Sequence, residues 1–458
     1  MVKTQIKNQN IFWLWSDEID LVKRSDAYYW LPKFLDIENT TKTGVKLQEL
    51  LIKNITYGHT PLGGKNTYTK KGILFIRSGQ LNDFFLDLTD NVYISESVHR
   101  CMQRSMIKSR DVLVATVGAT IGAVAIVPEI VQEANCNQAV GILRVDEKRL
   151  NPYYLAIYLT LPYGKEQILR QSSGGARDNL DPFELKQIKI VLPKIQDQQK
   201  VEQIVKEAFQ LKKEAEKERQ EADLILENSI KEFFTTDEPK AFWRWNTDIE
   251  IDKTLEPNFW KKTISSKKYP TIEFGDIFNY QKGTEVGSAL YQDSGIPFLR
   301  VSDLGDLEIQ FGNSSKYINE TLFNELKNEF QPHKGELLFS KDATIGLMAK
   351  VETEEKQIIS SGILRLQIKN KDFDPDFLMA FLTNKFINQE FVKNSTGSVI
   401  KHLNTQKLSK IELPLIDKQI QKEVANKIKS SISKKQFSRQ KLQEAKDFVE
   451  TLVRKSIK

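Results

Sequence analysis

Two segments of the chain carry small and apolar residues three and four positions apart, with charged residues between them. One segment follows Pro193, the other follows Pro414, and neither contains glycine or proline. This spacing is typical of a coiled-coil seam. It predicts long helices at 195–236 and 416–458, in which about 30 paired residues would form a rod roughly 45 Å long. The alternative is that each helix packs only on its own domain.

Each predicted seam contains one charged residue, Glu218 in the first helix and Lys435 in the second. An unpaired charge against an aliphatic layer is costly, so we expect an antiparallel register that places Glu218 opposite Lys435. Registers shifted by one heptad would place each charge against an aliphatic residue. The residues predicted to pair the helices are Val201, Ile204, Leu211, Glu218, Ile225, Ile428, Lys435, Leu442, Val449 and Leu452.

The sequence also contains an internal repeat, which is a sign of duplicated domains. Its six tryptophans form two sets displaced by 230 positions: Trp13, Trp15 and Trp30, then Trp243, Trp245 and Trp260. Further along, the segments at 72–81, 110–122 and 173–193 match those at 295–304, 335–346 and 396–414.

Each copy contains short β-branched runs bounded by Gly, Pro or polar residues, which predict strands. Asn151-Pro152 and Asp374-Pro375 look like helix starts, with a capping side chain followed by proline. The predicted fold class is therefore α+β, with two tandem homologous domains at 1–194 and 237–415. A Phe-Trp-x-Trp arm precedes each domain.

Composition changes this picture little. With 458 residues the chain is long enough for two domains, and a net charge of +6 is compatible with nucleic acid without requiring it. Two cysteines, Cys101 and Cys136, predict neither a disulfide framework nor a thiolate metal site. We found no apolar run of transmembrane length and no signal-peptide core, so we expect a cytoplasmic protein without a membrane partner.

The arrangement resembles the specificity subunits of Type I restriction–modification systems. Each copy ends in a motif like S-G-x-x-x-x-x-L…L-x-x-I-x-x-L-P and is followed by a long helix, and the resemblance covers nearly the whole chain. Its most characteristic parts are Ser173–Pro193 with Gln196–Gln203, Thr396–Pro414 with Asp417–Glu423, and the hairpin-like runs at 116–122 and 342–346. The Phe-Trp-x-Trp arms are not typical of the family, and could be an extra strand or a docking surface.

The resemblance implies that 1–194 and 237–415 are target-recognition domains, each reading one half of a bipartite, asymmetric site in double-stranded DNA. It implies that the two antiparallel coiled-coil helices set the gap and dock two methyltransferase subunits, which bind S-adenosylmethionine and modify adenine. A separate restriction and translocase subunit would cut the DNA. The chain itself would bind no cofactor, since S-adenosylmethionine, ATP and Mg²⁺ are expected on its partners.

No catalytic motif is complete. Asn151-Pro152-Tyr153-Tyr154 is similar to a motif of amino-methyltransferases, but the second proline and a glycine-rich cofactor loop are missing. Gly63-Gly64-Lys65-Asn66 lacks the Ser or Thr of a phosphate loop, so a turn is the simpler interpretation. The four histidines show no metal-ligand spacing. We therefore predict no catalytic and no metal-binding residue.

Candidate DNA contacts are polar residues in loops that occupy matched places in both copies. Arginine pairs with guanine and glutamine with adenine, while glycine-rich turns let the backbone approach phosphate. A structural ion pair or a simple chain reversal would explain several of these residues equally well. The candidates are Lys65, Arg77, Ser78, Gln80, Thr116, Thr120, Arg177, Lys282, Arg300, Ser302, Lys341, Thr344, Lys401 and His402.

The sequence thus favours a non-catalytic DNA reader. Two rival hypotheses remain: an enzyme that methylates DNA by itself, and a coiled-coil scaffold that binds proteins without DNA specificity.

Overall fold

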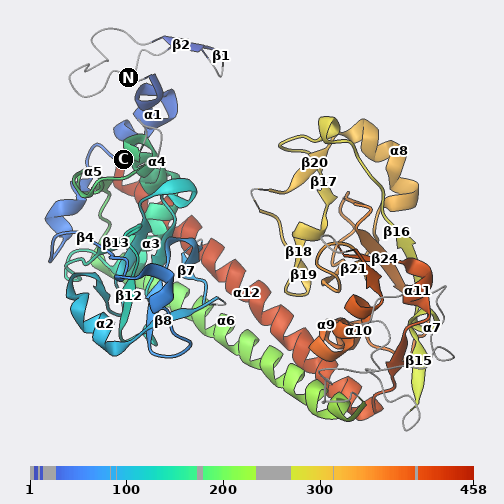
Figure 1. The fold of residues 1–458 in the computed structure, drawn as a ribbon. Coiled ribbons are helices and arrows are strands. Elements are labelled where there is room, and N and C mark those ends of the chain that lie inside the picture. The colour runs from blue at the N-terminus through green and yellow to red at the C-terminus, as the bar shows by residue number, and fades with distance from the viewer. Residues whose placement is uncertain are drawn as a thin grey trace. The chain divides into compact units, whose positions relative to one another are not determined.

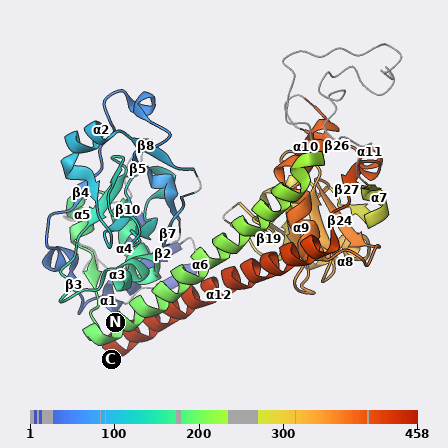
Figure 2. The same ribbon diagram turned by 90° about the horizontal axis from the view of Figure 1, so that it is seen from below.

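The computed structural model describes residues 5–8, 11–13, 27–82, 84–88, 90–172, 179–233, 270–312, 314–397 and 401–457. The chain divides into two compact units, one of residues 1–210 and 437–458 and one of residues 211–436. Each unit contains one α+β domain and a part of each long helix, α6 (Ile195–Ile230) and α12 (Lys418–Ile457) (Figures 1 and 2). We call these domains domain 1 and domain 2.

Domain 1 is built from short elements. Its described helices are α1 (Pro32–Thr40), α2 (Glu96–Cys101), α3 (Pro152–Thr160), α4 (Pro162–Ser172) and α5 (Pro182–Lys186). Its described strands are β1 (Gln5–Asn8), β2 (Ile11–Trp13), β3 (Val45–Lys46), β4 (Thr56–Tyr57), β5 (Ile73–Ile76), β6 (Leu81–Asn82), β7 (Phe85–Leu86), β8 (Val92–Ile94), β9 (Met106–Ile107), β10 (Val112–Ala115), β11 (Val124–Ile126), β12 (Ala134–Cys136), β13 (Val140–Leu143) and β14 (Lys189–Ile190).

Domain 2 has the same kind of composition. Its described helices are α7 (Phe274–Ile277), α8 (Glu320–Phe330), α9 (Pro375–Thr383), α10 (Lys385–Lys393) and α11 (Thr405–Ser409). Its described strands are β15 (Thr271–Glu273), β16 (Phe278–Lys282), β17 (Ile296–Leu299), β18 (Leu304–Gly305), β19 (Glu308–Ile309), β20 (Lys316–Ile318), β21 (Leu337–Ser340), β22 (Met348–Lys350), β23 (Ile358–Ile359), β24 (Ile363–Ile368), β25 (Ser395–Thr396), β26 (His402–Leu403) and β27 (Glu412–Pro414).

The strand order shows the duplication directly. An antiparallel sheet runs β4-β13-β10-β11 in domain 1 and β16-β24-β21-β22 in domain 2. A second sheet runs β8-β5-β12-β9 in domain 1 and β20-β17-β23 in domain 2, and both contain one parallel pair, β5 with β12 and β17 with β23. The α+β class and the repeated domains are therefore confirmed.

Matching helices begin as the sequence predicts. The side-chain oxygen of Asn151 accepts hydrogen bonds from the backbone N–H groups of Tyr153 and Tyr154 at the start of α3. Asp374 caps α9 in the same way, and a proline occupies the first turn of both helices. Because α3 and α9 are buried along nearly their whole length, they form the centre of the cores that join each domain to the long helices.

The two long helices run antiparallel and approach closely through small residues. The Ser431 hydroxyl donates to the Ala215 carbonyl oxygen at 2.7 Å, and the Ser438 hydroxyl donates to the Ala208 carbonyl oxygen at 2.8 Å. The predicted register placed Ala215 opposite Ser438 instead. It is therefore wrong by one heptad, although the antiparallel pairing itself is confirmed.

The two seam charges explain the error, because each has a partner beside the seam. Glu218 forms ion pairs with Lys427 and Lys434 of α12, both at 3.4 Å. Lys435 forms an ion pair with Asp306, which lies in the β18–β19 turn of domain 2. Neither charge faces an aliphatic layer unpaired, so the penalty that seemed to exclude this register is absent.

The predicted pairing residues are buried to different degrees. On α12, Ile428, Leu442, Val449 and Leu452 are buried and Lys435 is half-buried. On α6, Val201 is buried, but Ile204, Leu211, Glu218 and Ile225 are only half-buried. The fully buried positions of α6 instead include a column of small residues seven apart: Ala208, Ala215 and Ala222.

An ion cluster joins domain 1 to the start of α6. Arg110, which has a left-handed backbone (φ 69°), contacts Glu202 of α6 at 2.5 Å and Glu147 at 2.8 Å. Asn151 and Lys206 also contact the Glu202 carboxylate, at 2.5 and 3.0 Å. Burial raises the pKa of Glu202, but hydrogen bonds from Arg110, Asn151 and Lys206 outweigh burial and lower that pKa to about 2.

The observed register predicts which cysteine pairs can form a disulfide. In a background with Cys101→Ser, we expect Ala215→Cys with Ser431→Cys to cross-link on oxidation, because these residues are in contact. Ala215→Cys with Ser438→Cys, the pair of the shifted register, is the matched control and should remain reduced. Mass spectrometry of proteolysed, unreduced protein measures both. Cross-linking of the control pair alone would contradict the register.

The low pKa of Glu202 predicts a pH-dependent contribution to stability. Because this pKa lies below the ordinary value of 4.5, the stabilisation is present above about pH 4.5 and is lost as the pH falls towards 2. We expect Glu202→Gln to lower the free energy of unfolding by about 1–3 kcal/mol at neutral pH. Urea unfolding should show this difference shrinking below pH 4.5. Glu216→Gln, exposed on the same helix, should change little; a constant Glu202→Gln deficit across pH would refute the assignment.

Candidate nucleic-acid interface

Four loops of domain 1 meet at one edge, where strands β4, β5, β10 and β12 end. The His59 N–H donates to the Cys136 carbonyl oxygen at 2.9 Å, and the Asn137 N–H donates to the Ile76 carbonyl oxygen at 3.0 Å. The Thr116 N–H donates to the Ala139 carbonyl oxygen at 2.9 Å. These bonds fix residues 58–60, 77–80, 116–121 and 137–139 together, and we call this set loop edge 1.

Domain 2 builds the same edge from the matching loops. The Thr284 N–H donates to the Ile359 carbonyl oxygen at 3.0 Å, and the Ser360 N–H donates to the Leu299 carbonyl oxygen at 2.8 Å. The Lys341 N–H donates to the Gly362 carbonyl oxygen at 2.9 Å. Residues 283–285, 300–303, 341–345 and 360–362 therefore form loop edge 2. The two edges share a backbone plan.

A glycine permits the close approach of two loops in each edge. A Cβ atom on Gly58 would lie 2.0 Å from the carbonyl oxygen of Asn137, and one on Gly283 would lie 2.3 Å from that of Ser360. No side chain fits at such distances without moving the backbone. The repeated glycine thus holds the loop after β4 or β16 against the loop after β12 or β23.

The candidate loops after β5 and β17 are partly structural. The Arg77 N–H donates to the Gln80 side-chain oxygen at 2.9 Å, and the Arg300 N–H donates to the Asp303 carboxylate at 2.8 Å. Gln80 is 5% exposed and Asp303 is 2% exposed, so both side chains close a turn rather than reach outward. The half-buried Arg77 guanidinium contacts Asp90 at 2.9 Å, and that of Arg300 contacts the Ser314 carbonyl oxygen.

Lys341 and His402, both candidates, meet through a residue that the sequence did not single out. Asp342 contacts the Lys341 ammonium at 2.7 Å and the His402 Nδ1 atom at 3.0 Å. Lys341 is only 8% exposed, whereas His402 is exposed. In loop edge 1 the matching position is Thr116, which is 1% exposed and whose hydroxyl has no hydrogen-bond partner among the described residues.

The other candidates differ in exposure. Lys65, Lys282, Ser302 and Thr344 are exposed, while Ser78, Thr120 and Lys401 are half-buried. Of these, Ser78 and Thr120 belong to loop edge 1, and Ser302 and Thr344 belong to loop edge 2. Arg177 lies outside the described residues.

Several polar residues of the loop edges were missed by the sequence interpretation. Loop edge 1 also contains His59, Thr60, Asn137 and Gln138, and loop edge 2 contains Thr284, Glu285, Asp342, Ser360 and Ser361. A signal for those after β4 and β16 existed, because Gly58 followed by polar residues recurs as Gly283. The oxygen of the Asn137 side chain is buried and has no hydrogen-bond partner among the described residues.

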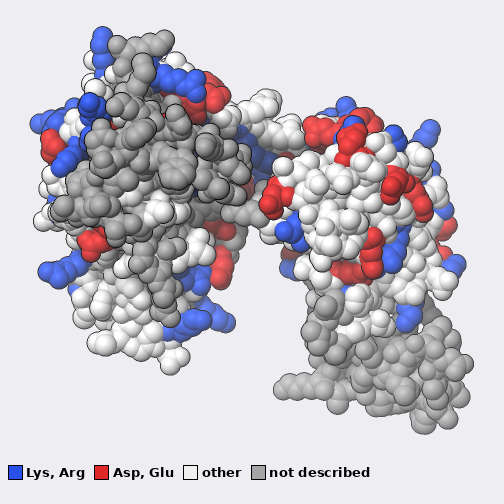
Figure 3. All heavy atoms as spheres, turned by 90° about the horizontal axis from the view of Figure 1, so that it is seen from above, with Lys and Arg blue, Asp and Glu red and all other residues white. Residues whose placement is uncertain are grey.

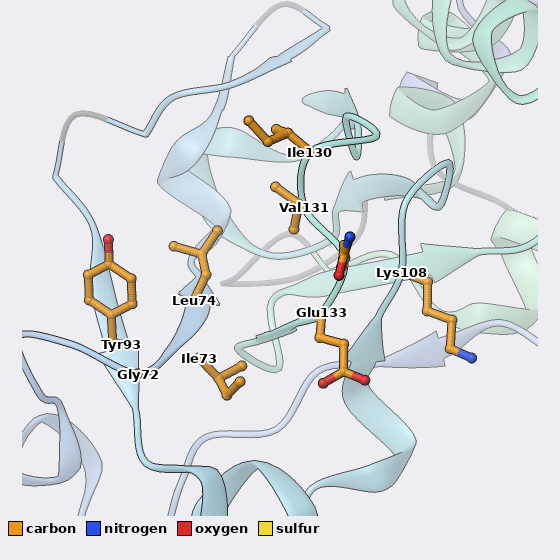
Figure 4. Close-up of a pocket in the computed structure, with 9 residues that line it drawn as sticks. Gly72, Ile73, Leu74, Tyr93, Lys108, Ile130, Val131 and Glu133 are labelled. Atoms are coloured by element: carbon orange, nitrogen blue, oxygen red, sulfur yellow. The ribbon is translucent and has the colours of Figure 1, made fainter.

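Among the residues that Figure 3 draws in colour, basic and acidic side chains are interspersed on the visible face. A shallow depression of about 640 Å³ in domain 1 is lined by Gly72, Ile73, Leu74, Tyr93, Lys108, Ile130, Val131, Gln132 and Glu133 (Figure 4). It lies at the start of β5 and β12, whereas loop edge 1 lies at their ends. The depression is therefore separate from the candidate interface.

No group of three or more His, Cys, Asp or Glu side chains in the described part of the chain is arranged to hold a metal ion. No described helix combines the length and the apolar character needed to cross a bilayer.

The burial of Gln80 predicts that its substitution costs stability. Gln80→Ala removes the acceptor for the Arg77 N–H and the donor to the Asp87 carbonyl oxygen. We expect the free energy of unfolding to fall by about 1–3 kcal/mol, measured by urea denaturation. The half-buried neighbour Ser78→Ala is the control and should stay within about 0.5 kcal/mol of the parent. A Gln80→Ala protein as stable as the parent would contradict this structural role.

The known proteins that this chain resembles are specificity subunits of Type I restriction systems. The Type I restriction enzyme EcoBI specificity subunit of Escherichia coli is 32% identical over 140 residues, 31% of this chain and 29% of that protein. The MjaVIII specificity subunit of Methanocaldococcus jannaschii is 23% identical over 63% of this chain and 65% of its own length. The chain thus spans less than two thirds of either relative. The crystal structure of a Type I restriction–modification S subunit from M. genitalium, 15% identical, covers 90% of this chain and 95% of that one, with a TM-score of 0.45.

A family model matches most of the chain and does so twice. The model, described as the Type I restriction modification DNA specificity domain, matches residues 43–222 and 266–447. Each match contains most of one domain, one loop edge and a large part of one long helix. The chain therefore belongs to the family of Type I restriction–modification DNA specificity domains.

Proposed function

We propose that this chain is the DNA-reading subunit of a Type I restriction–modification complex. Each domain binds one half of a bipartite, asymmetric site in double-stranded DNA, and the chain positions methyltransferase and restriction subunits there. The observation that carries this proposal is the family match in both copies, combined with two loop edges that share a backbone plan.

The side chains on the two edges differ, as an asymmetric site requires. Loop edge 1 presents the exposed amide of Gln138 beside the half-buried Asn137, where loop edge 2 presents the hydroxyls of Ser360 and Ser361. Amide side chains pair in two places with adenine, whereas serine accepts or donates less selectively. A common framework with different contact groups gives each domain its own preference for bases.

In this proposal the partner subunits catalyse the reactions on DNA. Two methyltransferase subunits hold S-adenosylmethionine and modify adenine, and a restriction and translocase subunit uses ATP and Mg²⁺. The chain is non-catalytic and acts in the cytoplasm. Its contribution is to hold its reading loops rigidly, since base readout depends on the geometry of hydrogen bonds.

The decisive experiment maps methylated sites in cells that express the chain with its methyltransferase. Asn137→Ala with Gln138→Ala should relax one half-site by about 10- to 100-fold in discrimination, the usual value of a lost base contact. Ser360→Ala with Ser361→Ala should relax only the other half-site. Gln132→Ala, an exposed amide at the opposite end of β12, is the matched control and should leave the map unchanged.

Two outcomes would contradict the proposal. One is that both double variants leave both half-sites intact. The other is that the purified chain binds no duplex in gel shifts, with or without methyltransferase, at any salt concentration. Binding to DNA through phosphates must weaken as salt rises, so complete absence at low salt would favour the coiled-coil scaffold.

A further inference from the structure

Both domains carry a small hairpin with a strained turn. In domain 2, Gly305 pairs with Glu308, so the turn residues are Asp306 and Leu307, with φ of 53° and 67°. In domain 1, Asn82 pairs with Phe85, and Phe84 in the turn has φ of 83°. A turn with two positive φ angles normally takes Asn-Gly or Asp-Gly. A large apolar residue with positive φ persists only when its surroundings hold it there.

In domain 1 the surroundings are aromatic. Phe84 is fully buried, and its ring centroid lies 5.7 Å from that of Phe209 on α6. The neighbouring Phe85 ring lies 4.9 Å from the same Phe209 ring. The turn therefore packs on α6 through apolar contacts. Salt screens charges and has little effect on such contacts.

In domain 2 the same turn is held differently. Leu307 is 6% exposed and belongs to the core cluster that includes Ala222 and Ile428 of the long helices. The Asp306 carboxylate forms an ion pair with Lys435 of α12, and these side chains are 55% and 15% exposed. Lys435 lies between Ser431 and Ser438, so it is a seam position of the helix pair. The Asp306 carboxylate therefore compensates the Lys435 charge, and the same ion pair holds the hairpin to α12.

Each hairpin continues directly from a candidate reading loop. The Asp87 N–H donates to the Gln80 carbonyl oxygen at 2.7 Å, and the Gln310 N–H donates to the Asp303 carbonyl oxygen at 2.8 Å. The hairpin strand thus closes back on the loop that carries Arg77 or Arg300. Movement of the hairpin would carry that loop with it.

We propose that the two hairpins are clamps that fix each loop edge on the long helices. In clamp 2 the Asp306–Lys435 ion pair supplements the apolar contact of Leu307, whereas Phe84 and Phe85 hold clamp 1 through aromatic contacts. Asp306 and Lys435 are positioning residues. Salt or loss of one charge loosens residues 304–309 while residues 81–82 and 84–86 stay closed. The consequence for reading the second half-site rests on the proposed function, but the clamp itself does not.

Hydrogen exchange on the full chain tests the clamps without DNA. Between about 0.05 M and about 0.5 M salt the screening length shortens severalfold, so exchange at 304–309 should accelerate about threefold or more while exchange at 81–82 and 84–86 stays constant. In Lys435→Met, exchange at 304–309 should already be as fast at low salt as it is in the parent at high salt. A change of salt should then no longer alter the exchange rate of this segment. Methionine suits a helical seam, so the helix at 428–438 should remain protected.

Charge exchange provides the rescue. Asp306→Lys or Lys435→Glu alone should open the hairpin, and the two together should restore protection of 304–309. Lys434→Met is the matched control, because Lys434 pairs with Glu214 and Glu218 on α6 rather than with the hairpin. Its effect on 304–309 should be absent.

The proposal is overturned if 304–309 exchanges at the parent rate in Lys435→Met, or if Lys434→Met accelerates it as much. It is also overturned if both hairpins respond equally to salt. Methylation mapping of Lys435→Met tests the consequence for function separately. Selective loss of methylation at the second half-site supports the positioning role. An unchanged map with an opened hairpin rejects the positioning role but does not contradict the clamp.

Discussion

The close antiparallel contact of α6 with α12 is the constraint on which the rest of the molecule depends. Small residues allow it, because Ser431 and Ser438 donate to carbonyl oxygens of the facing helix at Ala215 and Ala208. Each serine thereby satisfies its own hydroxyl in a buried place, where an unpaired polar group is costly. Both domain cores are completed by residues of this helix pair.

The two duplicated domains that pack on this helix pair have the same framework but differ in the surface of their loops. The strand order, the capped helices α3 and α9, and the glycines Gly58 and Gly283 repeat. Several polar side chains at the loop edges differ, as Asn137 and Gln138 do from Ser360 and Ser361. Backbone hydrogen bonds hold the loops, so side chains at their tips can differ without loss of the fold.

Much of this could be predicted from the sequence, because the determining signals are local or periodic. The displaced tryptophans revealed the duplication, and Asn151-Pro152 located a helix start. The helix register could not be predicted, since the partner of Lys435 is Asp306, 129 positions away in a turn that no periodicity reveals. Gln80 looked like a base reader for a similar reason: its partners are backbone groups that only the folded turn supplies.

The strained turns also have a consequence for how the chain matures during synthesis. Phe84 needs Phe209, which leaves the ribosome midway through translation, but Asp306 needs Lys435, near the very end. The first turn can therefore settle while the second domain is still being made. The second cannot settle until the last helix emerges and docks across a long loop, a slow step for contacts so distant in sequence. A nascent chain that lacks α12 can already make the contact of Phe84 with Phe209 but not that of Asp306 with Lys435, while the cores of both domains still await residues of α12.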